Sequence, residues 1–343
     1  MPGIITLDIF NNDAFSLASL TARYNGETSM YVPGQIGRLG IFEEGGVSTL
    51  TVMIEERDGS LSLIEPSKRG GPGETVGTNR DKLRSFVIPH LQRDDAVMAD
   101  EVQGRRAFGT DKDVETVQSV VDRKVNRHLR DLDATVEHHR VGAFKGVVLS
   151  KSGATLWNLY NEFGIAEPAA VNFELDNAAT NVRLKCEQLV REVEDELDTP
   201  YTGIHAMCGN DYWDKLTEHK SVREVWLAAQ KAAELLGKKA DTIQIGGITF
   251  ERYRTGKKAT AGNGGAGFFA ANEARFVPKG VPELFITRFA PADYEETVNT
   301  DGLPRYVKQW AMPNGKGRNI EVQSNPLNIC TRPAVLRKGV VAA

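Results

Sequence analysis

Residues 111–142 read DKDVETVQSVVDRKVNRHLRDLDATVEHHRVG and carry the strongest structural signal in the chain. Apolar residues recur here at spacings of three and four, the period of one face of an α-helix. They are Val114, Val117, Val121, Val125, Leu129, Leu132 and Val136. Thr110 and Asp113 suit the start of a helix and Gly142 suits its end. At 1.5 Å per residue, the ~31 residues from 111 to 141 would run about 46 Å. We expect a single spine helix, residues 111–141, on which other layers lie.

A β-hairpin is predicted on each side of this helix. After it, residues 146–160 read GVVLSKSGATLWNLY, with a turn at Ser152-Gly153 and a return strand running towards Phe163. Before it, apolar and polar residues alternate from Val47 to Pro66, around a turn at residues 57–60. The apolar face of this earlier hairpin contains Leu50, Val52, Ile54, Leu61 and Leu63.

The segment after the earlier hairpin, residues 67–77, is too rich in glycine and proline for regular structure. We therefore expect the hairpin to project from the body of the protein. An isolated two-stranded hairpin is only marginally stable in water, so its apolar face implies a partner surface.

The ends of the chain differ in character. Residues 1–43 show no sustained period and contain Pro33, Gly34, Gly37 and Gly40, which predicts an extended arm. The second half mixes expected helices and strands without the regular alternation of a doubly wound sheet, so the fold class is α+β. The expected helices are 176–197, a short one from 210 and one from a Ser221–Glu224 capping box to 237; the expected strands are 204–208, a hairpin over 243–250, 284–289 and 319–323.

Composition excludes several classes of protein. The 343 residues include 42 Lys+Arg and 46 Asp+Glu, a net charge of −4, whereas a dedicated nucleic-acid binder would show a basic excess. Cys186, Cys208 and Cys330 are too few and too scattered for a disulfide framework. The start lacks a signal peptide and no apolar run approaches the ~20 residues of a membrane span. These features predict a protein made and kept in a cytoplasm-like compartment.

Glycine is enriched, with 33 residues of 343, and one cluster has a formal dinucleotide-binding pattern. Gly262–Gly267 reads GNGGAG and fits G-x-G-x-x-G, but no strand precedes it and no helical spacing follows it. A flexible loop is favoured, and a nucleotide-binding enzyme that uses this loop remains the alternative.

Two histidine-containing segments are candidate metal sites. His205-x-x-Cys208 lies near Asp211, but no second ligand pair follows at a zinc-site spacing, so Cys208 is expected to be a buried apolar residue. His138 and His139 are adjacent and favour a solvated turn near the end of the helix. No metalloprotease or acyl-enzyme motif occurs. We expect no catalytic residue, cofactor site or metal site.

Several segments resemble a known family. The block FVPKGVPELFITRFAPADYEETVNTDGLP, residues 276–304, is similar to the C-terminal half of the lambda-type major capsid proteins of tailed bacteriophages, the major capsid protein E family. Residues 323–327 and 331–333 continue the match, and residues 33–42, PGQIGRLGIF, resemble the arm segment of the family. Matches at both ends imply that the resemblance covers the whole chain.

The resemblance implies the Hong Kong 97 type capsid fold and a protein that is not an enzyme. The implied division is an N-terminal arm over 1–43, an extended loop with its β-hairpin over 44–100, a peripheral domain over 101–175 and 317–343 with the spine helix 111–141, and an axial domain over 176–316. The Gly262–Gly267 loop would be one of the axial loops.

The implied function is self-assembly as hexamers and pentamers into the icosahedral head around double-stranded DNA, contacted non-specifically. The implied partners are a separate scaffolding protein, a portal and a decoration protein, with no membrane; assembly would occur in the host cytoplasm and the product is the virion. The candidate contacts between subunits are Leu50, Val52, Ile54, Leu61, Leu63, Lys68 and Arg69. Lys68 and Arg69 would face carboxylates of the next subunit or form a solvated basic loop. A cellular nanocompartment shell of the same fold remains an alternative.

Overall fold

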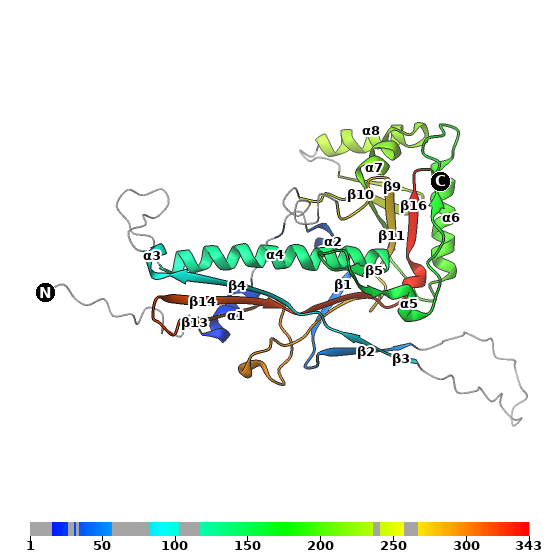
Figure 1. Ribbon diagram of the computed structural model, residues 1–343. Helices are drawn as coiled ribbons and strands as arrows, with labels where there is room; N and C mark the ends of the chain where they lie inside the picture. The colour runs from blue at the N-terminus through cyan, green and yellow to red at the C-terminus, as the bar shows by residue number, and fades with distance from the viewer. Residues whose placement is uncertain are drawn as a thin grey trace, which may run out of the picture.

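The computed structural model describes residues 16–26, 31, 34–56, 82–102, 117–235, 241–256 and 267–342. Figure 1 shows one long helix, α4, with strands along one side and a second body of sheet and helices at its C-terminal end. The mixture of helices with parallel and antiparallel strands confirms the α+β class.

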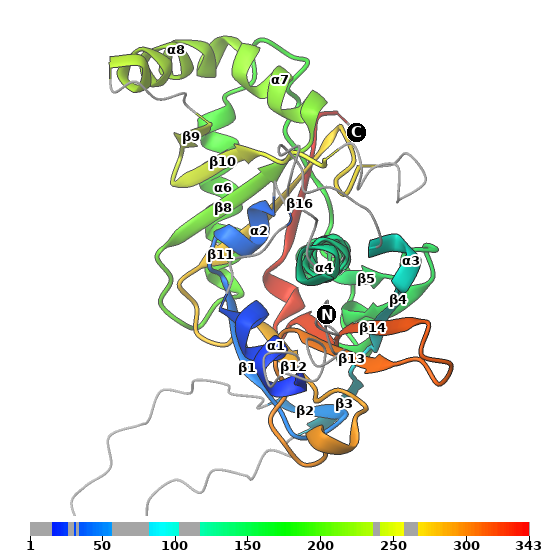
Figure 2. The same ribbon diagram turned by 90° about the vertical axis from the view of Figure 1, so that its left-hand side faces the viewer.

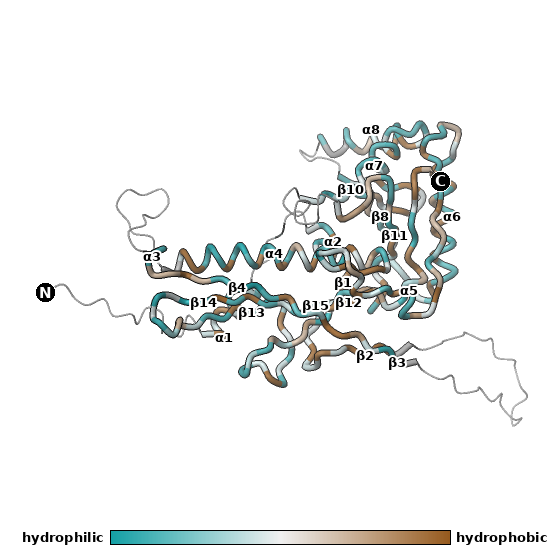
Figure 3. Tube along the Cα trace, viewed as in Figure 1, coloured by the Kyte–Doolittle hydropathy of each residue, from teal (hydrophilic) through white to brown (hydrophobic). Residues whose placement is uncertain are grey.

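The spine helix α4 spans Val117–Lys145. Val125 and Leu129 on its apolar stripe are fully buried, and Figure 3 shows apolar and polar residues alternating along the helix. Its predicted start at residue 111 lies outside the described residues. The predicted end at Gly142 is wrong, because the helix continues to Lys145 and is followed by Gly146, which has φ +77°. Gly142 is instead a packing glycine: a Cβ there would lie 2.8 Å from the Cα of Val148.

A three-stranded antiparallel sheet lies along the spine. Its strands, in spatial order, are β13 (Tyr306–Ala311), β14 (Gly317–Ser324) and β4 (Leu91–Met98), which runs into the short helix α3 (Ala99–Val102). Val97, Val307 and Val322 are buried with Val125 and Leu129 of α4 in one apolar cluster. This packing explains why the long helix is amphipathic, and it confirms the expected strand at 319–323.

The N-terminal arm is not extended where the structure describes it. Helix α1 (Leu17–Asn25) begins at Ser16, whose side chain accepts a hydrogen bond from the backbone N–H of Ser19, and buries Leu20 and Tyr24. The prediction of an arm without helix is therefore wrong here. Nine residues give too few apolar positions to establish a helical period.

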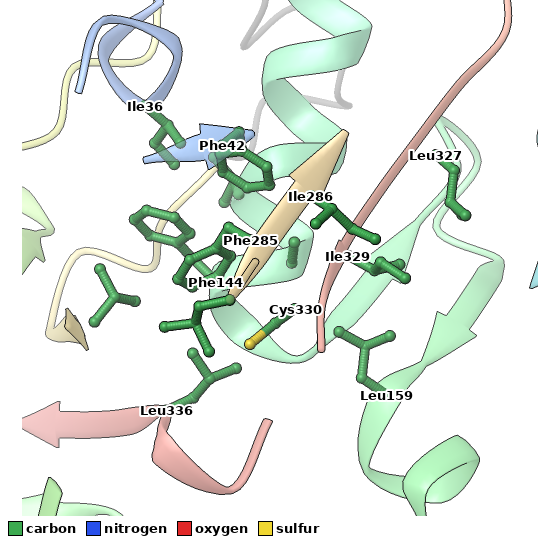
Figure 4. Packing of buried hydrophobic residues seen from close by; sticks show 14 of the residues in the cluster. Ile36, Phe42, Phe144, Leu159, Phe285, Ile286, Leu327, Ile329, Cys330 and Leu336 are labelled. Atoms are coloured by element: carbon green, nitrogen blue, oxygen red, sulfur yellow. The ribbon is translucent and has the colours of Figure 1, made fainter. Parts of the chain in front are cut away.

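The arm then enters the main core. Helix α2 (Gln35–Arg38) is followed by β1 (Phe42–Gly46), which pairs in parallel with β12 (Phe285–Phe289), itself antiparallel to β15 (Pro326–Cys330). Figure 4 shows Ile36 and Phe42 of the arm packed beside Phe144 and Phe285. The described part of the arm is thus packed into the folded protein.

A second β-hairpin follows the spine as predicted. Strands β5 (Val147–Leu149) and β6 (Thr155–Asn158) turn at Gly153, which has φ +83°. The return strand does not reach Phe163, because Asn158 caps a short helix, α5 (Leu159–Phe163), with its side-chain oxygen.

The second body is built on a six-stranded mixed sheet, flanked by three helices. The spatial order is β7 (Val171–Asn172), β16 (Arg337–Val340), β11 (Glu273–Lys279), β8 (Gly203–Cys208), β10 (Ile248–Arg252) and β9 (Thr242–Ile245); the helices are α6 (Val182–Asp195), α7 (Asn210–Glu218) and α8 (Lys220–Leu235). The expected strand at 204–208 and the hairpin over 243–250 are confirmed, with Gly246 and Gly247 at positive φ in the turn. Helix α8 begins one residue before Ser221, and the His219 ring accepts the bond from the Ser221 N–H, so the predicted capping box is wrong.

The sheets group the chain differently from the implied division. Strand β16 belongs to the six-stranded sheet although it lies within 317–343, the segment assigned with the spine. Strands β12 and β13 lie with the spine although they fall within 176–316. Among the described residues, short 3₁₀ helices at Glu295–Thr297 and Pro333–Val335 lie in connecting loops.

Candidate assembly interface

The predicted projecting hairpin corresponds to a two-stranded ribbon. Strand β2 (Thr51–Glu56) pairs antiparallel with β3 (Lys82–Val87), with Glu56 opposite Lys82 and Thr51 opposite Val87. Figure 1 shows the ribbon running away from the spine below the second body. The predicted return strand at Leu61 and Leu63, and also Lys68 and Arg69, lie outside the described residues.

One face of the ribbon packs on the protein's own core. Val52 and Ile54 contact the main apolar cluster, and Phe86 is fully buried with its ring 5.4 Å from that of Trp157. Arg84 lies over the ring of Phe163 at 5.1 Å and donates to the Phe163 carbonyl. Of the face predicted from the sequence, Val52 and Ile54 therefore pack within the protein itself.

The opposite face of the ribbon carries exposed apolar side chains beside the polar Thr51 and Ser85. Met53 and Leu83 are 63% and 64% exposed, and Val87 is 57% exposed. Directly opposed residues of an antiparallel pair share a face, so the pairs Thr51–Val87 and Met53–Ser85 place these side chains on one side. Leu50, just before β2, is 67% exposed. Clustered exposed apolar side chains of this size are typical of an interaction surface.

These outer-face residues were missed from the sequence. Leu83 and Val87 alternate with Arg84 and Phe86, which is a strand signal in itself. The missing information was the pairing of β2 with a strand that begins 26 positions after it ends, because only the register reveals which face of β2 turns inwards.

Buried charges join the spine to the six-stranded sheet. The Glu273 carboxylate on β11 has three cations around it: Lys145 Nζ at 3.4 Å, Arg275 Nη2 at 3.5 Å and Lys338 Nζ at 3.7 Å. Burial would raise the pKa of Glu273, but the cations Lys145 and Arg275 outweigh it and hold the pKa below its usual value. Removing one partner of such a group leaves an uncompensated buried charge, so this cluster fixes the end of α4 against the sheet.

A similar group joins the spine to the three-stranded sheet. Asp95 of β4 contacts His128 Nε2 at 2.8 Å and Lys124 Nζ at 3.6 Å. Burial acts to raise the pKa of Asp95, but the hydrogen bond from His128 and the charge of Lys124 lower it overall. Both groups are structural, since each joins elements of the subunit instead of lining a cleft.

The candidate metal ligands His205 and Cys208 have structural surroundings. Cys208 is fully buried in β8, and burial raises the pKa of its thiol well above the usual value. His205 on the same strand faces Glu251 at 3.3 Å. Within the ranges that the structure describes, no three His, Cys, Asp or Glu side chains are grouped so that they could hold a metal ion.

The expected solvated turn at His138 and His139 is wrong. Both residues lie inside α4, and His139 is buried, which lowers the pKa of its ring to about 4. Of the Gly262–Gly267 loop, only Gly267 is among the described residues. None of the helices in the described ranges has the length and apolar content to span a membrane.

Comparison with known proteins decides the family. The family described as "Phage major capsid protein E" matches residues 16–341. The chain belongs to this family. The major capsid protein of Pseudomonas phage KPP10 is 31% identical to this capsid protein over 333 residues, 90% of this chain and 92% of the relative. The major capsid protein of Salmonella phage Felix O1 is 26% identical over 354 residues, 94% and 95% of the two chains.

Solved structures agree on the fold. The putative capsid protein of an Escherichia coli CFT073 prophage has a TM-score of 0.61 at 14% identity and covers 95% of this capsid protein and 99% of its own chain. The capsid of the native GTA particle has a TM-score of 0.52 at 13% identity, over 92% and 95% of the two chains. The expected Hong Kong 97 type fold is confirmed.

The family resemblance read from the sequence is thereby confirmed, and so is its main functional consequence. The protein is a major capsid protein of a tailed phage, a structural component of the virion that forms a homo-oligomeric icosahedral capsid. The matching family and its named relatives are phage head proteins, not cellular nanocompartment shells.

Proposed function

We propose that this capsid protein closes into hexamers and pentamers, and that the outer face of the β2–β3 ribbon is a principal contact between copies. The observation that carries the proposal is the set of exposed apolar side chains Met53, Leu83 and Val87 on one face of the ribbon; Leu50, also exposed, comes just before β2 in the chain. In a homo-oligomeric shell, the nearest partner for an apolar face is another copy of the same chain. Closed symmetry then repeats one modest contact many times.

The original contact candidates divide into three groups. Leu50 remains a candidate because it is exposed, whereas Val52 and Ile54 support the ribbon from inside and are replaced by Met53, Leu83 and Val87. Leu61, Leu63, Lys68 and Arg69 stay proposals, since they fall in the segment 57–81 that links the two strands outside the described residues.

The division of the subunit is also a proposal. The spine helix and its three-stranded sheet would form the peripheral domain. The six-stranded sheet, including β16, would form the axial domain around the five- and six-fold axes. Residues 1–43 would be the arm, although α1 and α2 anchor its described part to the subunit.

The proposed partners follow from the capsid role. A separate scaffolding protein, a portal and a decoration protein would act with this chain in the host cytoplasm, and the finished head would enclose double-stranded DNA. The net charge of −4 supports a shell protein that contacts DNA non-specifically and does not bind it through its base sequence. No catalytic role is proposed.

The register of the ribbon gives a clean test. Glu56 lies opposite Lys82, so residues 57–81 can be replaced by a two-residue Asn-Gly turn that joins the paired strand ends. This variant keeps the outer face of the ribbon and deletes the candidate contacts Leu61, Leu63, Lys68 and Arg69, so it tests their part in the proposal. The shortened chain should fold, as judged by its thermal unfolding, but should form no closed shells in electron micrographs. Normal shells from the shortened chain would show that residues 57–81 are not needed for assembly. A matched control replaces the hairpin turn at Lys151–Gly153 by Asn-Gly and should leave assembly unchanged.

A further inference from the structure

The arm segment PGQIGRLG, quoted above only for its resemblance, occupies a specific place in the subunit. Figure 2 shows α2 (Gln35–Arg38) lying between the spine helix α4 and the strands of the six-stranded sheet. Gln35 and Ile36 are both buried. Four residues of the arm therefore fill the angle between the two bodies of the subunit.

On the sheet side, α2 is bound through one side chain. Gln35 Nε2 donates to Glu251 Oε1 at 2.7 Å and to the Arg252 carbonyl at 2.9 Å, and Gln35 Oε1 accepts from the Arg254 N–H at 2.5 Å. The Nε2 donor group and the Oε1 acceptor of this carboxamide thus all form hydrogen bonds, at the end of β10 and just after it. A buried amide with every group paired fixes both position and orientation.

On the spine side, α2 is bound through its backbone. Glu137 Oε1 accepts from the Ile36 N–H at 2.8 Å, and Glu137 Oε2 accepts from the Gly37 N–H at 3.1 Å. These N–H groups lie at the start of α2, where no carbonyl of the helix can accept from them. Tyr253 also donates its hydroxyl to Glu137 Oε1 at 3.1 Å, a direct link between spine and sheet.

The glycines of the segment are explained by this position. Gly34 has φ +43° where the chain turns into α2, a region that disfavours other residues. A Cβ on Gly37 would lie 3.0 Å from Arg140 Nη1 of the spine. Small residues at these two positions allow α2 to sit close against α4.

We propose that residues 34–38 are a latch that holds the spine helix and the six-stranded sheet at one angle. Near its end, the spine is attached to the second body by the Lys145–Glu273 cluster and by Phe144, which is buried with Met207 and Val277 in the main apolar cluster. Eight residues before Lys145, Glu137 is attached to the latch and to Tyr253. Two attachments about 12 Å apart define the angle, whereas one attachment acts as a pivot. An angle fixed within the subunit fixes the curvature at which copies of the chain can meet.

The distances along the spine helix give the size of the expected movement. If the latch slips by about 2 Å, the spine rotates by about 10° around the Lys145 end. Arg127 lies 18 residues from that end, so its position would move by about 4–5 Å. A shift of that size is measurable between two spin labels.

The test measures this angle in the free subunit. Nitroxides are attached at Arg127→Cys in α4 and Asp214→Cys in α7, both exposed positions, while the native cysteines are buried. Gln35→Ala should broaden the distribution of the label-to-label distance or shift it by up to about 4–5 Å, and should speed amide exchange in α2. Gln188→Ala, on the exposed face of α6, should leave both unchanged.

Two further variants keep the proposal falsifiable. Tyr253→Phe removes only the direct bond between sheet and spine, so with the latch intact the distance distribution should stay narrow. If Gln35→Ala does not fold, Gly37→Ala crowds Arg140 without deleting a hydrogen bond and should still broaden the distribution. The proposal would be overturned if folded Gln35→Ala or Gly37→Ala kept a narrow distribution of label-to-label distances, whether or not the α2 amides exchanged faster. Because the measurement needs no shell, it is independent of the proposed role of the ribbon.

Discussion

Truncating the outer face of the ribbon should weaken assembly without weakening the subunit. The double variant Met53→Ala, Leu83→Ala removes two side chains that are 63% and 64% exposed in the subunit. Burying a side chain of this size completely is worth about 1.5–3 kcal/mol. Covering the exposed two-thirds of each is then worth about 1–2 kcal/mol, or about 2–4 kcal/mol for the pair.

That loss corresponds to a large change in assembly. About 2–4 kcal/mol per contact weakens the association constant by roughly 30- to 1000-fold. We expect the critical concentration for shell formation, measured by sedimentation of purified subunits under identical conditions, to rise by at least ten-fold. Exposed substitutions usually change stability by no more than about 0.5 kcal/mol, so the free energy of unfolding should remain near that of the wild type.

An inner-face variant provides the matched control. Ile54 lies on the same strand but packs against the main cluster, so Ile54→Ala should lower the free energy of unfolding by about 1–2 kcal/mol. Its folded subunits should assemble near the wild-type critical concentration. The reasoning is refuted if the outer-face variant assembles like the wild type, or if the inner-face variant is the one that loses assembly.

Three other outcomes follow from the subunit. His139→Leu should reduce the loss of stability in acid, which denaturant titrations at pH 6.5 and pH 4 measure. In the wild type, burial lowers the pKa of the His139 ring from 6.5 to about 4, so the unfolded chain binds the proton first. The free energy of unfolding of the wild type should therefore fall by up to about 3 kcal/mol between these two pH values. Gly142→Ala should destabilise by about 1–3 kcal/mol in thermal unfolding although alanine favours helix, and an unchanged midpoint would contradict the close contact with Val148. Asp133 forms an ion pair with the buried Arg305, which also donates to the Tyr24 carbonyl of α1. Asp133→Asn should therefore lower the free energy of unfolding by about 3–5 kcal/mol and speed hydrogen exchange of the α1 amides. Unchanged protection of the α1 amides would contradict this link between α1 and the spine.

Long periodic elements were the predictable part of this fold. The spine helix repeats its apolar positions over many turns, so its period survives irregularities in single residues. The hairpin over 243–250 was visible because Gly246-Gly247 supplies the two positive φ angles of a tight turn. The resemblance of residues 276–304 supplied the shell fold, which no local period could have given.

Short and non-local features were the unpredictable part. Gly142 looked like a helix end, but the close approach of the β5 strand, a tertiary contact, explains its lack of a side chain. The arm helices contain too few residues to show a period, and α2 forms because Glu137, about a hundred positions later in the chain, accepts its first N–H groups.

The contact face of the ribbon shows the same limit. Alternation along β2 predicted one apolar face, which includes Val52 and Ile54, as the contact face. The pairing with β3 and the packing of Phe86 on Trp157 turn that face inwards. Which face of β2 turns inwards can be decided only once its partner strand is known.

A cryo-electron microscopy reconstruction of particles formed by this chain tests the central claim most directly. The account predicts closed icosahedral shells in which Met53, Leu83 and Val87 are buried against a neighbouring copy while Val52 and Ile54 keep their contacts within the subunit. Closed shells in which the outer face of the ribbon stays exposed to solvent would contradict it.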